Sequence, residues 1–172
     1  MLCLSCLPLA AGCAPSPHDL AARHDNTGLA ALLEKRPAAV DDRDRKGKTP
    51  LHAAVNGRNA EAMALLVEKG ADVNAGDVTG MTPLHVAAML GRSAESQWLL
   101  EHGANAAARD HFGDTPAHTA AVFGQGGVMA GLVAHGAPLD ARNRDGRTPA
   151  ELARHYRQGK AADHLDRLAA RR

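Results

Sequence analysis

The sequence predicts an all-α repeat solenoid, a fold in which short helices stack one unit after another. Three observations support this prediction. The dipeptide Thr-Pro recurs every 33 residues, at Thr49, Thr82, Thr115 and Thr148. Aromatic residues make up only 2% of the 172 positions, whereas alanine fills about a fifth of them. Aromatic side chains usually dominate a globular core, and small side chains bury little area each, so this composition favours thin helices packed closely and repeatedly.

Composition and charge exclude several other classes of protein. Charged residues make up 23%, too few for a charge-rich disordered chain. The sequence contains no run of about 20 apolar residues, which is the length that a transmembrane helix needs. The formal net charge is +1, which gives no general argument for binding nucleic acid. Residues 141–172 nevertheless hold nine Lys and Arg against four Asp and Glu, so the carboxyl end predicts a basic patch.

Residues 1–17 read as a leader and a short tether. All three cysteines lie here, at Cys3, Cys6 and Cys13, so no disulfide framework supports the rest of the chain. The stretch Leu9–Cys13 resembles a bacterial lipoprotein signal, in which cleavage leaves the cysteine as a lipid-bearing first residue. The resemblance implies a lipid on Cys13 and a periplasmic, membrane-tethered protein. No positive charge precedes Leu2, so the alternative is a cytosolic regulator or secreted effector with an uncleaved amino terminus.

The 33-residue unit predicts a pair of helices followed by a hairpin loop. Thr caps a helix well, and Pro at the first helical position has no N–H to leave unpaired. We expect first helices over 51–55 and 84–88, and second helices over 61–69 and 94–102. Gly70 and Gly103 then suit the left-handed position that ends a helix. The following segment runs out and back around a glycine such as Gly80. One unit cannot bury its own apolar face, so the units must stack.

The motif resembles the ankyrin repeat. Thr-Pro-Leu-His is complete at 49–52 and 82–85 and stands as Thr-Pro-Ala-His at 115–118, with a Gly two residues before each Thr. The resemblance implies an ankyrin repeat domain over 18–172, with helix-turn-helix pairs and β-hairpin loops. It comprises about five units, of which the first and last are degenerate caps. The predicted units are 18–43, 44–76, 77–109, 110–143 and 144–172.

Three departures from the pattern predict local weakness or difference. The fourth unit carries glycines within and around 124–131, and glycine costs up to about 1 kcal/mol in a helix interior, so we expect it to be the soft point of the stack. Glu95 and Ser96 fall where apolar residues usually pack, so we expect their helix to be seated shallowly. Gly57 comes one residue earlier than its counterpart Gly91, so we expect a different interhelix turn.

The ten histidines invite a catalytic or metal-binding interpretation, which their spacing does not support. His52, His85 and His118, here called the motif histidines, should lie about 10 Å apart at helix-packing distance. That is too far to share one zinc ion, whose ligands lie about 2 Å away. We expect each to bond Thr or backbone groups and to tie loops together. No nucleophile has an identifiable base, and the glycines of 124–127 lack a phosphate-loop ending. The sequence therefore predicts no catalytic, cofactor or metal site and a protein that is not an enzyme.

The resemblance implies that a protein partner binds the hairpin tips and the exposed ends of the first helices. An apolar centre with a charged rim is typical of such a surface, and aromatic residues are favoured anchors. The predicted apolar centre comprises Val78, Met81, Met89, Leu90, Phe112, Val122, Phe123 and Tyr156. The predicted basic rim, which would meet acidic groups of the partner, comprises Arg45, Lys46, Lys48, Arg142, Arg144 and Arg147. We expect Trp98 to pack between units instead, and the protein to be a monomer.

Nucleic-acid binding is the remaining alternative. It would use Arg142, Arg144, Arg147, Arg154 and Arg157 at the basic carboxyl end. The aromatic side chains that would stack on bases are scarce, so this alternative ranks below protein binding.

Overall fold

The computed structural model describes residues 15–170, which form ten α-helices, one 3-10 helix and no strand. The elements are α1 (Pro17–Ala22), α2 (Asn26–Lys35), η1 (Pro37–Asp41), α3 (Pro50–Gly57), α4 (Ala60–Glu68), α5 (Pro83–Leu90), α6 (Ser93–Glu101), α7 (Pro116–Val122), α8 (Gly126–Ala134), α9 (Pro149–His155) and α10 (Gly159–Ala169). The predicted all-α solenoid is confirmed.

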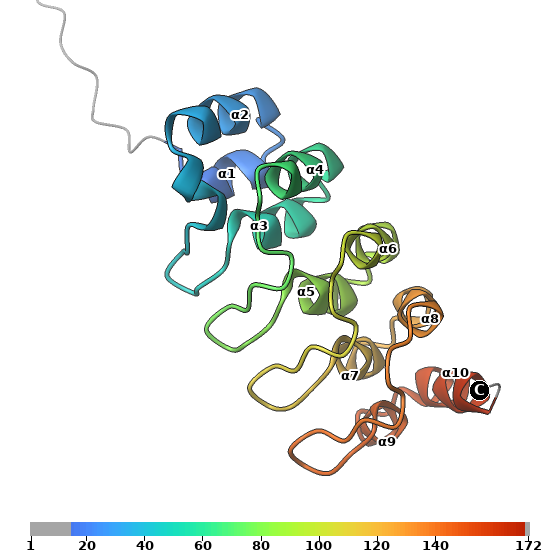
Figure 1. Cartoon of the computed structure of the whole chain (residues 1–172). Coiled ribbons are helices and arrows are strands. Elements are labelled where there is room, and N and C mark those ends of the chain that lie inside the picture. Colours follow the sequence, from blue (N-terminus) through green and yellow to red (C-terminus); the bar gives the residue numbers. More distant parts are fainter. Residues whose placement is uncertain (1–14, 171–172) are drawn as a thin grey trace, which may run out of the picture.

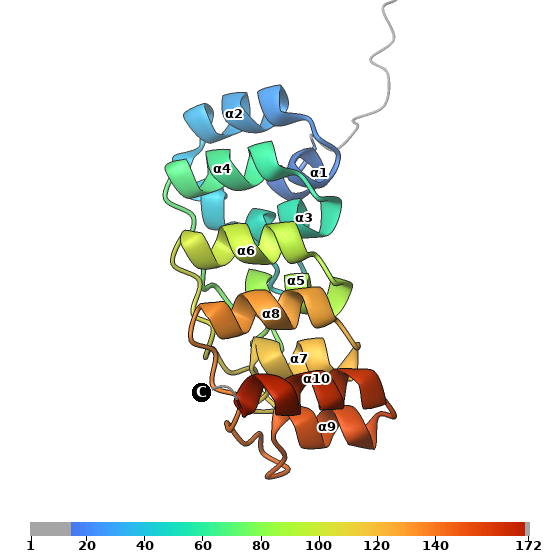
Figure 2. The ribbon, with the colours of Figure 1, turned by 90° about the vertical axis from the view of Figure 1, so that its right-hand side faces the viewer.

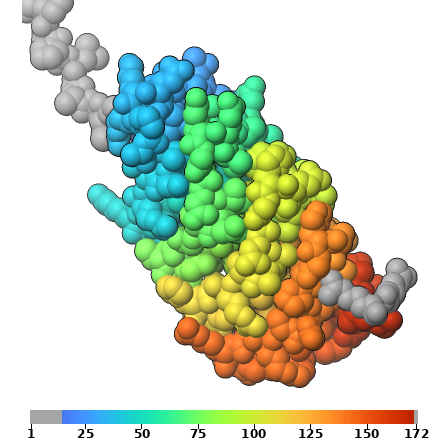
Figure 3. Space-filling view, viewed as in Figure 1, coloured from blue at the N-terminus to red at the C-terminus, as the bar shows by residue number. Residues whose placement is uncertain are grey.

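The helices form two layers that follow one another in chain order. Odd-numbered helices make an inner layer in which α1 packs on α3, α5 on α7 and α7 on α9. Even-numbered helices make an outer layer beside it, seen in Figure 2. Long loops leave the inner layer on one side as parallel hairpins (Figure 1). The units lie side by side from the amino to the carboxyl end (Figure 3), so each contacts mainly its neighbours.

Two ladders of small and branched side chains explain the composition. One alanine per unit is fully buried at the same place in each inner helix: Ala21, Ala54, Ala87, Ala120 and Ala153, all at 0% exposure. One leucine per unit does the same in the outer helices: Leu33, Leu66, Leu99, Leu132 and Leu165, at 2% or less. Alanine lets neighbouring inner helices approach closely, and leucine fills the wider space between the layers. Aromatic side chains are therefore not needed for this core.

The motif histidines do what the spacing predicts. In the second unit, Nδ1 of His52 accepts a hydrogen bond from the backbone N–H of Thr49 at 3.1 Å. Its Nε2 lies 2.9 Å from the carbonyl oxygen of Met81, in the next hairpin. Since Nδ1 accepts, the neutral ring must donate through Nε2. Each motif histidine therefore caps its own helix and ties that helix to the next loop.

Two of the three expectations drawn from departures from the repeat pattern are wrong. Glu95 and Ser96 are buried, at 9% and 1% exposure, so α6 is seated as deeply as its neighbours. The carboxylate of Glu95 meets Arg58 at 3.6 Å, which offsets part of the cost of its burial. The turn after α3 also matches the later ones: Arg58 adopts the left-handed conformation, φ 58°, that Gly91 adopts at φ 66°.

Trp98 packs against the core from the outer layer and is half-buried. Its ring also stacks on His102, with ring centroids 3.7 Å apart and the planes 16° from parallel. Trp98 is thus a packing residue, and part of its covering comes from its own helix end. Among residues 15–170, no helix is long and apolar enough to cross a membrane.

Candidate binding groove

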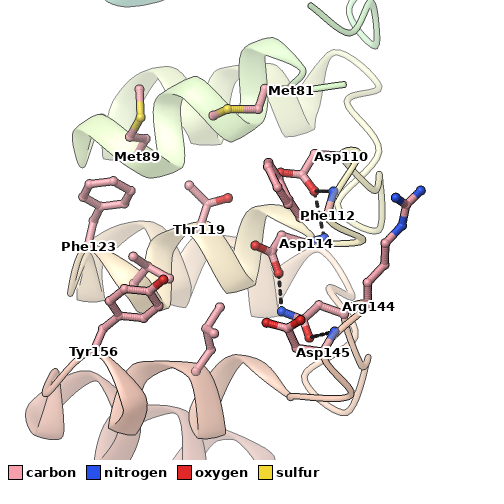
Figure 4. Close-up of a pocket in the computed structure, with 13 residues that line it drawn as sticks. Met81, Met89, Asp110, Phe112, Asp114, Thr119, Phe123, Arg144, Asp145 and Tyr156 are labelled. Carbon is pink, nitrogen blue, oxygen red and sulfur yellow. Dashed lines mark hydrogen bonds between the residues drawn. The ribbon is translucent and has the colours of Figure 1, made fainter. Parts of the chain in front are cut away.

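A groove of about 410 Å³ opens where α5, α7 and α9 meet the last two hairpins (Figure 4). We call it the inner groove. It is lined by Met81, Met89, Asp110, Phe112, Asp114, Thr119, Val122, Phe123, Asn143, Arg144, Asp145, Leu152 and Tyr156. Apolar side chains from the inner helices make up one end, and two hairpins contribute polar side chains together with Phe112 at the other. One groove therefore offers two kinds of contact.

The hairpin around Phe112 is fixed by its own backbone and by Asp110. Oδ1 of Asp110 accepts hydrogen bonds from the backbone N–H groups of Phe112 and Asp114, at 2.8 and 2.9 Å. Gly113 adopts φ 76°, which a glycine takes without strain. The carbonyl of Phe112 accepts from the backbone N–H of Arg144 at 3.0 Å, joining this hairpin to the next. The tip is held, and the Phe112 side chain is left 65% exposed.

The same hairpin is anchored to the helix layer by His85. Nε2 of His85 lies 3.1 Å from the carbonyl oxygen of Asp114, while Nδ1 accepts from the backbone N–H of Thr82. His118 repeats the arrangement on the carbonyl of Arg147. Burial lowers the pKa of both imidazoles, and Nδ1 already accepts an N–H, so there is no place for a second ring proton. The polar end of the groove is therefore held by neutral histidines.

The apolar end depends on a position that repeats every 33 residues. Leu90, Phe123 and Tyr156 are equivalent positions at the ends of successive inner helices. Leu90 packs against the core, whereas Phe123 and Tyr156 are 49% and 54% exposed. Met89 lies on α5, across from Phe123 (Figure 4), and is half-buried. The exposure of both aromatic rings creates an uncovered apolar surface.

The polar end is mainly acidic, which the sequence analysis missed. Asp110, Asp114 and Asp145 contribute three carboxylates to the lining, against the single guanidinium of Arg144. Oδ1 of Asp114 accepts from Nδ2 of Asn143 at 2.7 Å. One signal was present in the sequence: Asp114 stands where the preceding unit has Met81 and the following one Arg147. The chemistry at that position changes from unit to unit, as expected of a residue facing a partner.

The other predicted basic residues do not form a rim around the inner groove. Arg45 lies at the opposite end, beside a hollow shared with His18 and Asp19. Arg142 bonds the carbonyl of Gly146 at 2.6 Å and the carboxylate of Glu151 at 3.1 Å, both in the following unit.

The hairpins also carry four further residues of the predicted binding surface: Lys46, Lys48, Arg147 and Val78. Lys46 lies next to Val78, whose N–H donates to the Lys46 carbonyl at 3.0 Å. The Lys48 carbonyl lies 2.7 Å from Nε2 of His18. Arg147 pairs with Asp145 at 3.5 Å. Val78 itself is 61% exposed at a hairpin tip outside the groove, and Cys13 lies outside the described residues.

The described part of the chain holds no group of three or more His, Cys, Asp or Glu side chains arranged to bind a metal ion. The motif histidines are occupied by Thr and carbonyl groups, as described above. What the inner groove offers is non-covalent contact: aromatic and thioether surface at one end and carboxylate oxygens at the other.

Comparison with known proteins agrees with this architecture. The family model described as ankyrin repeats (3 copies) matches residues 18–110, which is more than half of the chain. No curated protein matches the chain. The remaining residues continue the pattern with two further Thr-Pro helices, α7 and α9. The chain therefore belongs to the ankyrin repeat family.

Proposed function

We propose that this protein is a non-enzymatic binding module that holds a protein partner in the inner groove. Ankyrin repeats are generally protein-interaction modules. The observation that carries the proposal is the placement of exposed apolar surface. Within residues 15–170 the exposed large hydrophobic side chains are Val78, Phe112, Phe123 and Tyr156, all at hairpin tips or inner-helix ends. Three of the four line the inner groove, and aromatic side chains exposed in a groove are favoured hot spots.

A double substitution, Phe112→Ala with Phe123→Ala, tests this proposal. Both side chains are exposed by about half or more, so we expect the melting temperature to stay within about 2 °C of the parent. Cross-linking in the native host should lose the partner. Glu68→Ala with Lys69→Ala, on the opposite layer, is the matched control and should keep it. Loss of melting temperature with the partner retained would mean that the two rings are structural and that the site is wrong.

We also propose that a lipid on Cys13 tethers the repeats to a bacterial membrane, facing the periplasm. The support is the stretch Leu9–Cys13 followed by a short Pro-containing segment. Mass analysis of the native amino terminus tests this, since a lipidated Cys13 as first residue is expected and a retained Met1 would exclude it. Cys13→Ser should release the protein from the membrane fraction. A retained Met1 would favour the alternative, a cytosolic regulator or secreted effector using the same groove.

Nucleic-acid binding through the carboxyl end receives less support than protein binding. Three of its five arginines already contact carboxylates: Arg142 with Glu151, Arg147 with Asp145, and Arg154 with Asp166. Such pairing leaves fewer free cations for phosphate groups. A gel-shift assay at low salt with random DNA and RNA checks this alternative directly.

A further inference from the structure

We propose that the inner groove selects a protein segment that carries a cationic side chain three residues from an apolar one. This inference rests on the proposed function and names the chemistry of the partner. It differs from the acidic partner that the basic rim suggests, because the carboxylates line the groove and most of the predicted rim does not. The argument depends on the charge of one end, the apolarity of the other, and the distance between them.

The charge at the hairpin end favours a cation. Asp110, Asp114 and Asp145 all line the groove. Oδ1 of Asp114 is bonded to Asn143, while within residues 15–170 its Oδ2 has no partner and can accept a further hydrogen bond. Arg144 extends along the outer side of the hairpins, away from the aromatic rings of Phe123 and Tyr156 (Figure 4). A Lys or Arg side chain entering the groove would therefore meet carboxylates first.

Neighbouring arginines do not cancel this preference. Nη1 of Arg109 bonds the carbonyl oxygens of Gly113 and Arg142, both at 2.8 Å, and does not line the groove. Arg147 contacts Asp145 at 3.5 Å from outside the lining, which leaves Asp110 and Asp114 as the lining carboxylates without an ion pair. His118 is buried and neutral, so it adds no positive charge. The groove is thus acidic where a partner would enter at the hairpin end.

The two ends are separated by the length of α7. Asp114 stands two positions before this helix begins and Phe123 directly after it ends, and the seven helical residues between them, at 1.5 Å each, span roughly 10 Å. A polyproline II segment advances about 3.1 Å per residue and returns to the same face every third residue, so side chains three residues apart lie about 9 Å apart on one face. That spacing fits an apolar side chain against Phe123, Tyr156 and Met89 and a cation at Asp114.

Fluorescence anisotropy with labelled nine-residue peptides and the full chain tests the proposal. The probes carry Phe-Pro-Ser-Arg, with Gln or Glu replacing Arg in two variants and Phe directly next to Arg in a third. We expect the Arg probe to bind about tenfold tighter than the Glu probe and about fivefold tighter than the Gln probe at low salt. The preference should weaken as salt is raised. The probe with adjacent Phe and Arg should bind no better than the Gln probe.

Asp114→Asn and Asp163→Asn make a matched pair of variants. Both remove one negative charge, but Asp163 lies exposed on α10, away from the groove. An amide at position 114 still accepts from Asn143, so the hairpin keeps its bond. We expect Asp114→Asn to abolish most of the Arg-over-Gln preference and Asp163→Asn to leave it unchanged. Phe123→Ala should weaken the Arg and Gln probes by the same factor.

Several outcomes would overturn the inference. Equal or tighter binding of the Glu probe would do so, and so would an Arg preference that survives Asp114→Asn. Failure of every probe to bind at millimolar concentration would also refute it. If the cross-linked partner is nevertheless lost in the Phe112 and Phe123 variant, the proposed binding function stands and only the assigned chemistry fails.

Discussion

The contact that joins the groove to the helix layer is His85, and His85→Ala measures what that contact contributes. The imidazole is fully buried. It accepts from the N–H of Thr82 at 3.2 Å, lies 2.9 Å from the Thr82 hydroxyl, and meets the carbonyl of Asp114 at 3.1 Å. The substitution removes all three contacts. It frees the hairpin that carries Asp110, Phe112 and Asp114 from α5.

The magnitude follows from the contacts removed. A hydrogen bond contributes about 1 kcal/mol net, and the two Thr82 donors share the single lone pair of Nδ1, so the bonds amount to about 2–3 kcal/mol. Removing a fully buried ring also leaves a cavity that the close-packed inner helices cannot fill. We therefore expect the free energy of unfolding to fall by about 3–5 kcal/mol. That is a large part of the 5–15 kcal/mol typical of a folded domain.

The last unit supplies the control. Glu151 stands at the same motif position and caps its helix by accepting from the N–H of Thr148 at 2.8 Å, but within residues 15–170 its side chain bonds Arg142 of the preceding hairpin and not a later one. Urea unfolding at pH 7.5, followed by far-UV circular dichroism and by the fluorescence of Trp98, compares the two variants. Glu151→Ala should cost clearly less than His85→Ala. If the two cost the same, the bond from His85 to the hairpin contributes nothing and our account of how the groove is held is wrong.

Three further predictions follow from burial and backbone geometry. Because burial lowers the pKa values of the motif histidines below 6.5, their contribution to stability should be complete above pH 6.5 and decline as the pH falls below it, since the unfolded chain takes up protons there before the folded one does; a flat urea midpoint would contradict this. Gly131→Ala should raise the free energy of unfolding by about 0.5–1 kcal/mol, since its new Cβ would meet only Gln97 Oε1 at 3.5 Å. Gly57→Ala should lower the thermal midpoint instead, because its Cβ would lie 2.6 Å from the backbone oxygen of Ala22.

The substitution Gly131→Ala also tests the predicted soft point of the stack. Gly131 belongs to the glycine-rich segment of the fourth unit, where the sequence predicts weakness from helix propensity alone. Stabilisation by alanine there would confirm that the propensity cost is present. An unchanged midpoint in Gly131→Ala would mean that packing of α8 already offsets it.

The helix ends and the repeat were predictable because their causes are local. A Thr-Pro pair defines where an inner helix begins, and Gly70 and Gly103 end the outer helices in the left-handed conformation, as expected. The exposure of Phe112 and Phe123 was predictable for a related reason. Once the period is known, each position inherits its place from its counterpart 33 residues away, and hairpin tips face solvent.

The acidic end of the groove was not predictable from the same period. Asp114 and Asp145 are near in space because one hairpin stacks on the next, and Asn143 holds the Asp114 carboxylate across that junction. Arg58 and Glu95 show the same limitation. A buried Glu95 contradicts the expected apolar pattern until Arg58, 37 positions earlier, is seen to reach it.

By itself, then, the amino-acid sequence determined the repeated unit, the order of its helices, the tie between each motif histidine and the next loop, and which aromatic residues lie outside the core. Each depends on neighbours in the chain or on a fixed offset of 33. The tertiary structure alone decided that Leu90 is partly buried against the core while Phe123 and Tyr156 are exposed, and that three carboxylates share a groove with these two aromatic residues. The physical reason is that charge and exposure at a point depend on every group within a few ångströms, and stacking brings those groups from different units.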